Sequence, residues 1–180
     1  MADAPSIDQV AQRLQAFAAD ARSLSPQAFA TQHGPAFLLF SGGARGLTPR
    51  ASSEQTITGG AAGSDRPGFK PNQDFLVFPL ISRRSAGSGT ISVGRTRRAD
   101  VVIPDGSLTR VQAFFRFDGD RFSLADAASK NGTWVDDQRV PVWSSDQWLP
   151  IRSGARIRMG DLRMTFLTVG PFVELVIRLT

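Results

Sequence analysis

The chain has 180 residues, of which 41% are hydrophobic, so it can form one packed domain with an extension and is not disordered throughout. It contains no cysteine, no tyrosine and one histidine, which excludes disulfides, thiolate chemistry and metal clusters built on several histidines. The 21 basic residues exceed the 16 acidic ones and give a net charge of +5, which favours acidic partners in general.

Arginine supplies almost all of the positive charge, because Lys70 and Lys130 are the only lysines. The planar guanidinium group can bind phosphate oxygens in pairs, so this bias favours an oxyanion-binding surface. A general preference for arginine over lysine explains the same composition equally well. No apolar run reaches the ~18 residues that a membrane span needs, and the first residues lack the features of a secretory signal. We therefore expect a cytoplasmic protein with no membrane contact.

Residues 1–35 are predicted to form a helical extension. Ser6 and Gln9 fit a capping box, and apolar residues follow at helical spacing as far as Leu24. Ser25 before Pro26 is typical of the start of a second helix, because serine caps the first backbone N–H groups and proline suits the first helical position.

Residues 36–73 are predicted to contain a short strand at 37–40, followed by a long loop rich in glycine and serine. The sequence leaves two arrangements of the N-terminal part open. Either the helices cover an edge of the main domain and the strand joins its sheet, or the helices form a separate docking element.

Residues 74–180 carry short apolar stretches separated by turns, which predicts an antiparallel β-sandwich. Gly160 and Asp161 are typical of a two-residue hairpin turn, and Pro171 is predicted to open a last short helix. One set of residues at every second position is expected to share one face of a strand: Val111, Ala113, Phe115 and Phe117. The predicted fold class is therefore all-β, with a short α-helical N-terminal extension.

Residues 89–96 imitate a phosphate-binding P-loop. The true motif needs a flexible glycine-rich loop, a lysine and a following helix. Here β-forming residues fill the loop, Arg95 replaces the lysine and another strand follows. The stretch therefore does not predict a nucleotide-hydrolysing site.

The same residues fit a different pattern together with three later stretches. Gly94-Arg95, then residues 100–103 (Asp-Val-Val-Ile), then residues 108–113 (Leu-Thr-Arg-Val-Gln-Ala), then residues 129–133 (Ser-Lys-Asn-Gly-Thr) resemble the ordered motifs of the forkhead-associated (FHA) domain. The resemblance covers about residues 75–168 and implies an FHA-like β-sandwich. Each motif is weak alone, but their order and spacing make the set specific.

The resemblance implies a role for each motif residue in phosphopeptide binding. Arg95 is the principal phosphate ligand, and Thr109 offers a hydroxyl where the family has a serine. Asn131 matches the asparagine that bonds the main chain of the ligand. Arg110 and Lys130 lie beside these residues and add positive charge for the phosphate or its flanks. Read without the family, Arg95 is a solvated arginine, and Thr109 and Asn131 are ordinary turn residues.

Three further residues are expected to support the binding loops: Gly94, Gln112 and Gly132. Gln112 replaces the family's histidine and Thr109 replaces its serine, and both departures put tight binding in doubt. A few charge-assisted hydrogen bonds, less the cost of ordering a peptide, imply a micromolar rather than a nanomolar dissociation constant.

The implied function is a phosphothreonine-dependent protein–protein interaction module, an adaptor whose partner is a threonine-phosphorylated protein such as a Ser/Thr kinase or its substrate. One alternative is a degenerate FHA scaffold that binds partners without phosphate, motivated by Thr109 and Gln112. Another is nucleic-acid binding, motivated by a pI of about 11.1 and by the arginine pairs at 83–84 and 97–98, although no nucleic-acid motif is present.

Catalysis is the least favoured class. The paired aspartates at 118 and 120 and at 136 and 137 occupy predicted hairpin turns, and no nucleophile elbow accompanies them. We expect no catalytic residues, no bound metal and no cofactor.

Overall fold

A computed structural model describes residues 11–42, 47, 74–82, 89–144 and 147–180 of the chain. The capping box at Ser6 and Gln9 and most of the predicted loop after residue 41 lie outside the described residues. The division of the chain after residues 35 and 73 stays a prediction.

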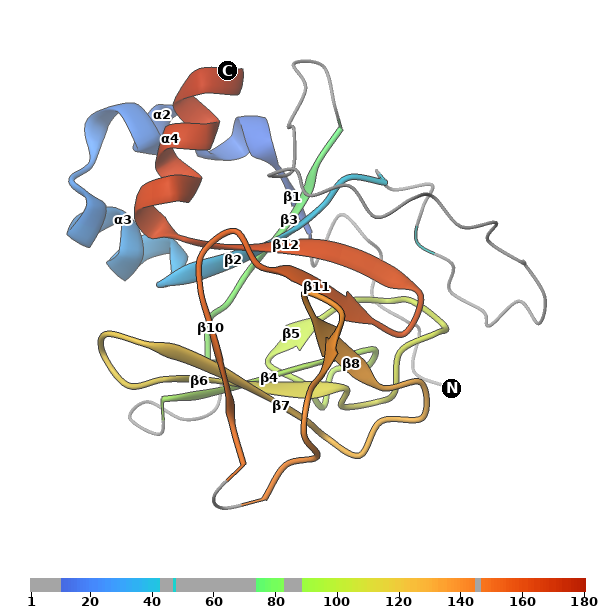
Figure 1. The fold of residues 1–180 in the computed structure, drawn as a ribbon. Helices are drawn as coiled ribbons and strands as arrows, with labels where there is room; N and C mark the ends of the chain where they lie inside the picture. The colour runs from blue at the N-terminus through green and yellow to red at the C-terminus, as the bar shows by residue number, and fades with distance from the viewer. Residues whose placement is uncertain (1–10, 43–46, 48–73, 83–88, 145–146) are drawn as a thin grey trace.

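Two sheets pack face to face, and the all-β fold class is confirmed (Figure 1). The seven-stranded sheet has, in order, β1 (Gln12–Arg13), β3 (Leu76–Pro79), β2 (Ala36–Phe40), β12 (Leu162–Thr168), β11 (Arg156–Met159), β8 (Thr133–Val135) and β9 (Gln138–Arg139). The five-stranded sheet has β10 (Leu149–Ile151), β7 (Phe122–Asp126), β6 (Ala113–Phe117), β4 (Thr90–Gly94) and β5 (Val101–Val102). Every neighbouring pair is antiparallel except β4 and β5, which run parallel.

The core between the sheets follows the predicted alternation of apolar residues. Ala113 and Phe115 on β6 are fully buried, and Phe117 packs against the same cluster. The ring of Phe115 lies 6.2 Å from the ring of Phe166 on β12, which joins the two sheets. The predicted turn at Gly160 and Asp161 connects β11 and β12 as an antiparallel hairpin.

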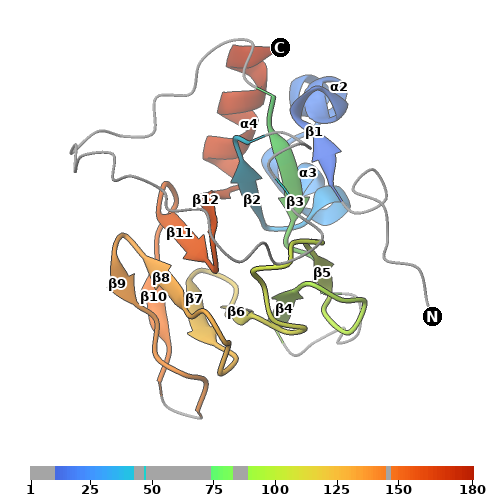
Figure 2. The ribbon, with the colours of Figure 1, turned by 90° about the vertical axis from the view of Figure 1, so that its right-hand side faces the viewer.

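A helical layer covers the outer face of β2, β3 and β12 (Figures 1 and 2). It consists of the 3-10 helix η1 (Leu14–Phe17) and the helices α2 (Ala18–Ser23), α3 (Pro26–His33) and α4 (Val169–Leu179). All five residues of β2 are buried, because alternate side chains enter the core between the sheets and a second core beneath the helices. Of the two arrangements considered above, the structure therefore has the packed one.

The helix predicted as far as Leu24 is present only in part. Gln12 and Arg13 form β1 and pair with Val77 and Leu76 of β3, so the prediction of a helix at these two residues is wrong. Pairing with β3 satisfies the backbone groups of these residues, which overrides a helical spacing of apolar side chains. The cap of α3 is confirmed, since the Ser25 hydroxyl accepts a hydrogen bond from the Ala28 N–H at 3.3 Å.

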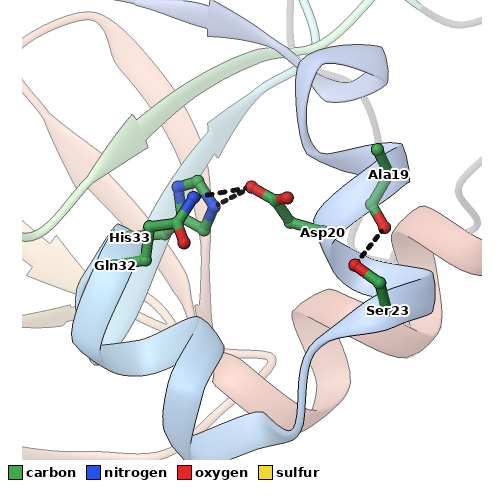
Figure 3. A network of polar contacts seen from close by, with 5 residues as sticks. All are labelled: Ala19, Asp20, Ser23, Gln32 and His33. Atoms are coloured by element: carbon green, nitrogen blue, oxygen red, sulfur yellow. Dashed lines mark hydrogen bonds and ion pairs between the residues drawn. The ribbon is translucent and has the colours of Figure 1, made fainter.

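Asp20 joins α2 to α3 (Figure 3). Its carboxylate oxygen lies 2.7 Å from Nε2 of His33 and accepts a hydrogen bond from Nε2 of Gln32 at 2.8 Å. The His33 ring also packs against Phe17 and Phe29, with ring centres 5.2 and 4.6 Å apart. The single histidine of the chain is therefore part of the helical layer.

Among the described residues, no helix has the length and apolar character needed to cross a bilayer.

Phe172 packs α4 into the second core, which lies between the helical layer and the seven-stranded sheet. Its ring stacks on Phe37 of β2 at 3.8 Å, and it is fully buried. We expect Phe172→Ala to lower the free energy of unfolding by about 3–5 kcal/mol, because it leaves a cavity among aromatic rings. Ile177→Ala on the same helix is the control, since Ile177 is 47% exposed and its loss should cost less than about 1 kcal/mol. Equal effects in urea denaturation would contradict this packing.

Candidate functional site

The sheet topology brings three loops to one end of the five-stranded sheet. Because β5 runs parallel to β4, both strands end there, and the register pairs Val93 with Val101. β6 is antiparallel to β4 and begins opposite Val93, while β7 is antiparallel to β6 and ends there. The loops that carry the predicted motifs, residues 95–100, 103–112 and 127–132, therefore meet. Counting strands as a simple up-and-down series does not predict this meeting, because it omits the parallel pair.

Direct hydrogen bonds join the three loops. The Arg95 N–H donates to the carbonyl oxygen of Thr109 at 3.0 Å. The Lys130 N–H donates to the hydroxyl oxygen of Thr109, also at 3.0 Å. The side-chain amide of Asn131 donates to the carbonyl oxygen of Ser107 at 2.8 Å. Thr109 is thus the residue at which the first and third loops meet.

Gln112 ties these loops together from beneath and is completely buried. Its Oε1 accepts a hydrogen bond from the Thr109 N–H at 3.0 Å. Its Nε2 donates to the Ser129 hydroxyl at 2.7 Å and to the carbonyl oxygen of Gly132 at 2.8 Å, with the Thr133 hydroxyl 3.2 Å away. Glutamine is flexible in solution, but burial and bonds at both ends of its amide hold this one in a defined position.

Asp126 fixes the third loop, and sequence reasoning missed it. This carboxylate is 4% exposed and accepts hydrogen bonds from the Ser129 N–H and hydroxyl at 2.7 Å each, and from the Thr133 hydroxyl at 2.6 Å. Its three-residue spacing from Ser129 is a common local pattern, in which an aspartate bonds a nearby backbone N–H. That spacing is the signal that could have found it.

Two more aspartates, also absent from the prediction, hold the other loops. Asp100 accepts from the Ser92 N–H at 2.9 Å and closes the loop that contains Arg95. Asp105 accepts from the Ser107 N–H at 2.9 Å and shapes the loop before Thr109. The carboxylates of these aspartates are thus engaged in bonds within the loops.

Two of the predicted glycines lie where a side chain does not fit. A Cβ atom on Gly94 would lie 2.3 Å from the carbonyl oxygen of Arg110, so glycine allows the first and second loops to approach. Gly132 has a φ of +76° and its Cβ would lie 2.5 Å from the ring of Trp134. Both the backbone conformation and the space at Gly132 therefore favour glycine.

The predicted ligand residues keep groups available for a ligand. Arg95 is half-buried and its guanidinium has no hydrogen bond or ion pair with any described residue, and Arg110 and Lys130 are exposed. The Thr109 oxygen accepts from Lys130, so the hydroxyl proton can be donated elsewhere. Asn131 uses its NH₂ group on Ser107, which leaves its oxygen as an acceptor. The described residues contain no cluster of histidines or carboxylates suited to a metal ion.

The Gln112 network generates a stability prediction. We expect Gln112→Leu to lower the free energy of unfolding by about 2–4 kcal/mol, since it leaves the Thr109 N–H without its acceptor and removes one of the two donors to the Gly132 carbonyl. Gln138→Leu on exposed β9 is the matched control and should change stability by less than about 0.5 kcal/mol. Hydrogen exchange at residues 129–133 should become faster in Gln112→Leu alone. Unchanged exchange there would mean that Gln112 does not hold the loops.

Comparison with known proteins gives three kinds of match. The family model of the FHA domain matches residues 91–160. The glycogen accumulation regulator GarA of Mycolicibacterium smegmatis is 37% identical over 100 residues, 51% of this chain and 59% of that protein. The oxoglutarate dehydrogenase inhibitor of Corynebacterium jeikeium is 35% identical over 96 residues, 49% of this chain and 62% of that protein. The chain thus spans about three fifths of the length of these relatives.

Solved structures are also similar. One, from work on phosphothreonine-dependent FHA domain interactions, has a TM-score of 0.42 and 27% identity, and covers 51% of this chain and 83% of its own. Another, full-length Pml1p of yeast, has a TM-score of 0.46 and 16% identity, and covers 81% of this chain and 94% of its own. The residues that match the FHA domain model, 91–160, contain all three motif-bearing loops.

Proposed function

We propose that the FHA domain binds a phosphothreonine-containing segment of another protein at the three joined loops, with Arg95, Thr109, Arg110, Lys130 and Asn131 as contacts. The observation that carries this proposal is the unpaired, half-buried guanidinium of Arg95 in a loop bonded directly to Thr109. A cation held at the surface without an acidic partner among the described residues is suited to an anionic ligand.

The chemistry of a phosphothreonine matches the groups that the loops offer. The phosphate brings about −1.5 to −2 charges and three strong acceptor oxygens. Arg95 supplies a charged fork and Thr109 a hydroxyl proton, while Lys130 and Arg110 add charge at the rim. The side-chain oxygen of Asn131 accepts a hydrogen bond from a backbone N–H of the ligand. The bond from the Asn131 NH₂ group to the Ser107 carbonyl sets the direction of this oxygen.

The hydrogen bonds of Gln112 and Asp126 beneath the loops support the same function. Binding is strongest when donors are held in place before the ligand arrives, because less conformational entropy is then lost. Gln112 and Asp126 bond Ser129 in the third loop, Gln112 also bonds Gly132, and its Oε1 accepts from the Thr109 backbone. The hydrogen bonds of Gln112, and the lack of space for a Cβ atom at Gly94 and Gly132, support the proposal that these three residues hold the binding loops in place.

We further propose that the protein acts as a non-catalytic adaptor in the cytoplasm. Two relatives carry names of regulators, a glycogen accumulation regulator and an inhibitor of oxoglutarate dehydrogenase. By analogy, the partner is a threonine-phosphorylated enzyme, or the Ser/Thr kinase that modifies it. No cofactor takes part in this mode of recognition.

Arg95→Ala tests the proposal directly. Loss of two charge-assisted hydrogen bonds, each worth about 1.5–3 kcal/mol, should weaken binding of a phosphothreonine peptide by roughly 100-fold or more. Arg98→Ala is the control, because Arg98 is exposed in the same loop and its substitution removes the same charge. The measurement is fluorescence anisotropy with a library of phosphothreonine peptides and matched phosphoserine and unphosphorylated forms.

The outcomes separate the competing functions. Equal binding of phosphorylated and unphosphorylated peptides would favour the phosphate-independent scaffold. Equal losses in Arg95→Ala and Arg98→Ala would show that only net charge matters, and would favour general polyanion binding.

A further inference from the structure

A row of four side chains crosses the outer face of the seven-stranded sheet. Arg163 on β12 pairs with Arg158 on β11, Arg158 pairs with Trp134 on β8, and Trp134 pairs with Arg139 on β9. Residues directly opposite each other on neighbouring strands project from the same face of a sheet. We call these four residues the arginine–tryptophan row.

The row points away from the core. The residues next to it along the strands, such as Ile157, Met159 and Val135, are buried in the cluster between the sheets. Arg139 and Arg163 are exposed, and Arg158 and Trp134 are half-buried. The helical layer covers the other end of this face, over β2 and β3, and does not extend to β8 and β9 (Figures 1 and 2).

The positive charges of the row are only partly offset within the described residues, where Asp137 and Asp161 attract Arg158. Arg156, on the same face of β11, lies 3.5 Å from Asp136 and 3.6 Å from Asp137. Arg139, Arg158 and Arg163, in contrast, form no ion pair with a described carboxylate. Arg158 instead lies over the Trp134 ring, with its Cζ atom 3.4 Å from the ring centre, and Arg139 lies 5.8 Å from the same centre.

Placing two arginines directly opposite each other is unfavourable for folding. Burial first, and the nearby charge of Arg163 second, lower the pKa of Arg158 from its ordinary value. An anionic partner seated over the row would turn the repulsion into attraction.

The row is continuous with the phosphopeptide loops. Trp134 follows Gly132 by two residues, and its ring lies against Gly132. The turn after β11 also reaches the loops, because the Gly160 N–H donates to the Gly132 carbonyl and the Asp161 N–H donates to the Ser107 hydroxyl. A peptide chain leaving Asn131 can therefore pass onto the row without crossing other elements.

We propose that the arginine–tryptophan row binds a short carboxylate-rich segment of the same phosphorylated partner, and this proposal rests on the proposed function. Asp136 and Asp137 after β8 and Asp161 after β11 lie at the turns that flank the row. These acids repel a long continuous polyanion, whereas a cluster of a few carboxylates fits between them. The row crosses four neighbouring strands at about 4.8 Å spacing, which limits that cluster to a few residues.

The test uses the full chain and three phosphothreonine peptides. One has neutral flanks, and the other two carry four glutamates behind a Gly-Ser linker on the N- or C-terminal side. We expect one glutamate tail to strengthen binding at least fivefold. In the double variant Arg139→Gln, Arg163→Gln the gain should fall below twofold, with the affinity for the neutral peptide unchanged. The control variant Arg152→Gln, Arg178→Gln removes two exposed charges elsewhere and should keep the gain.

Each other outcome overturns the proposal. The row binds no acidic segment if neither tail strengthens binding, or if the double variant keeps the gain. If both double variants lose the gain in affinity from the glutamate tail, that gain is an effect of net charge. Binding of a single-stranded oligonucleotide that depends on Arg139 and Arg163, without a gain from either tail, would assign the row to nucleic acid. Failure of the proposed function is seen separately, as absence of phosphate-dependent binding of the neutral peptide.

Thermal unfolding checks that the double variant Arg139→Gln, Arg163→Gln is folded. Removing Arg163 relieves the repulsion on Arg158, so the midpoint of thermal unfolding should not fall. A lower midpoint would mean that the two arginines stabilise the fold, so that no ligand is needed to explain why they face each other.

Discussion

The buried amide of Gln112 is the interaction on which the candidate site depends. One end accepts from the Thr109 backbone and the other donates to the loop that carries Lys130 and Asn131. A buried amide left without partners costs free energy, so the loops and the glutamine hold one another in a single arrangement. The positions of the proposed phosphate contacts follow from that arrangement, together with the bond from Arg95 to Thr109.

The remainder of the fold supplies the frame around this network. The parallel pairing of β4 and β5 places three loops at one end of the five-stranded sheet. The seven-stranded sheet closes the core on the opposite side, and its outer face is divided between the helical layer and the arginine–tryptophan row. Phe37 and Phe172 stack in the core beneath the helical layer, away from the loops that carry the proposed phosphate contacts. This separation allows site residues to be unpaired without loss of the core.

The sequence predicted those features that depend on local pattern. Alternation on β6, the hairpin turn at Gly160 and the Ser25 cap each follow from neighbouring residues, and the structure has all three. The order of the motifs, read through the family, indicated Arg95, Thr109 and Asn131 as a set. Their roles as ligands stay predictions, although the backbone bonds bring their loops together.

Most of the missed features depend on contacts between residues far apart in the chain, whereas the bond from the Ser129 N–H to Asp126 follows a local pattern. Gln12 and Arg13 leave the predicted helix because β3, more than sixty residues later, offers backbone partners. Asp126 is in hydrogen-bond reach of Thr133 only after β7 and β8 have been placed in different sheets. The arginine–tryptophan row combines four strands, and no spacing in the sequence shows that its members face one another.

The most direct test of the central claim is an NMR titration of isotope-labelled protein with a phosphothreonine peptide. We expect the largest chemical-shift changes at the backbone amides of Arg95, Thr109, Lys130 and Asn131 and at the side-chain amide of Gln112. All of these resonances should shift with the same dependence on peptide concentration. Shifts confined to the helical layer, or shifts in one loop without the others, would show that the three loops do not form one phosphate-binding unit.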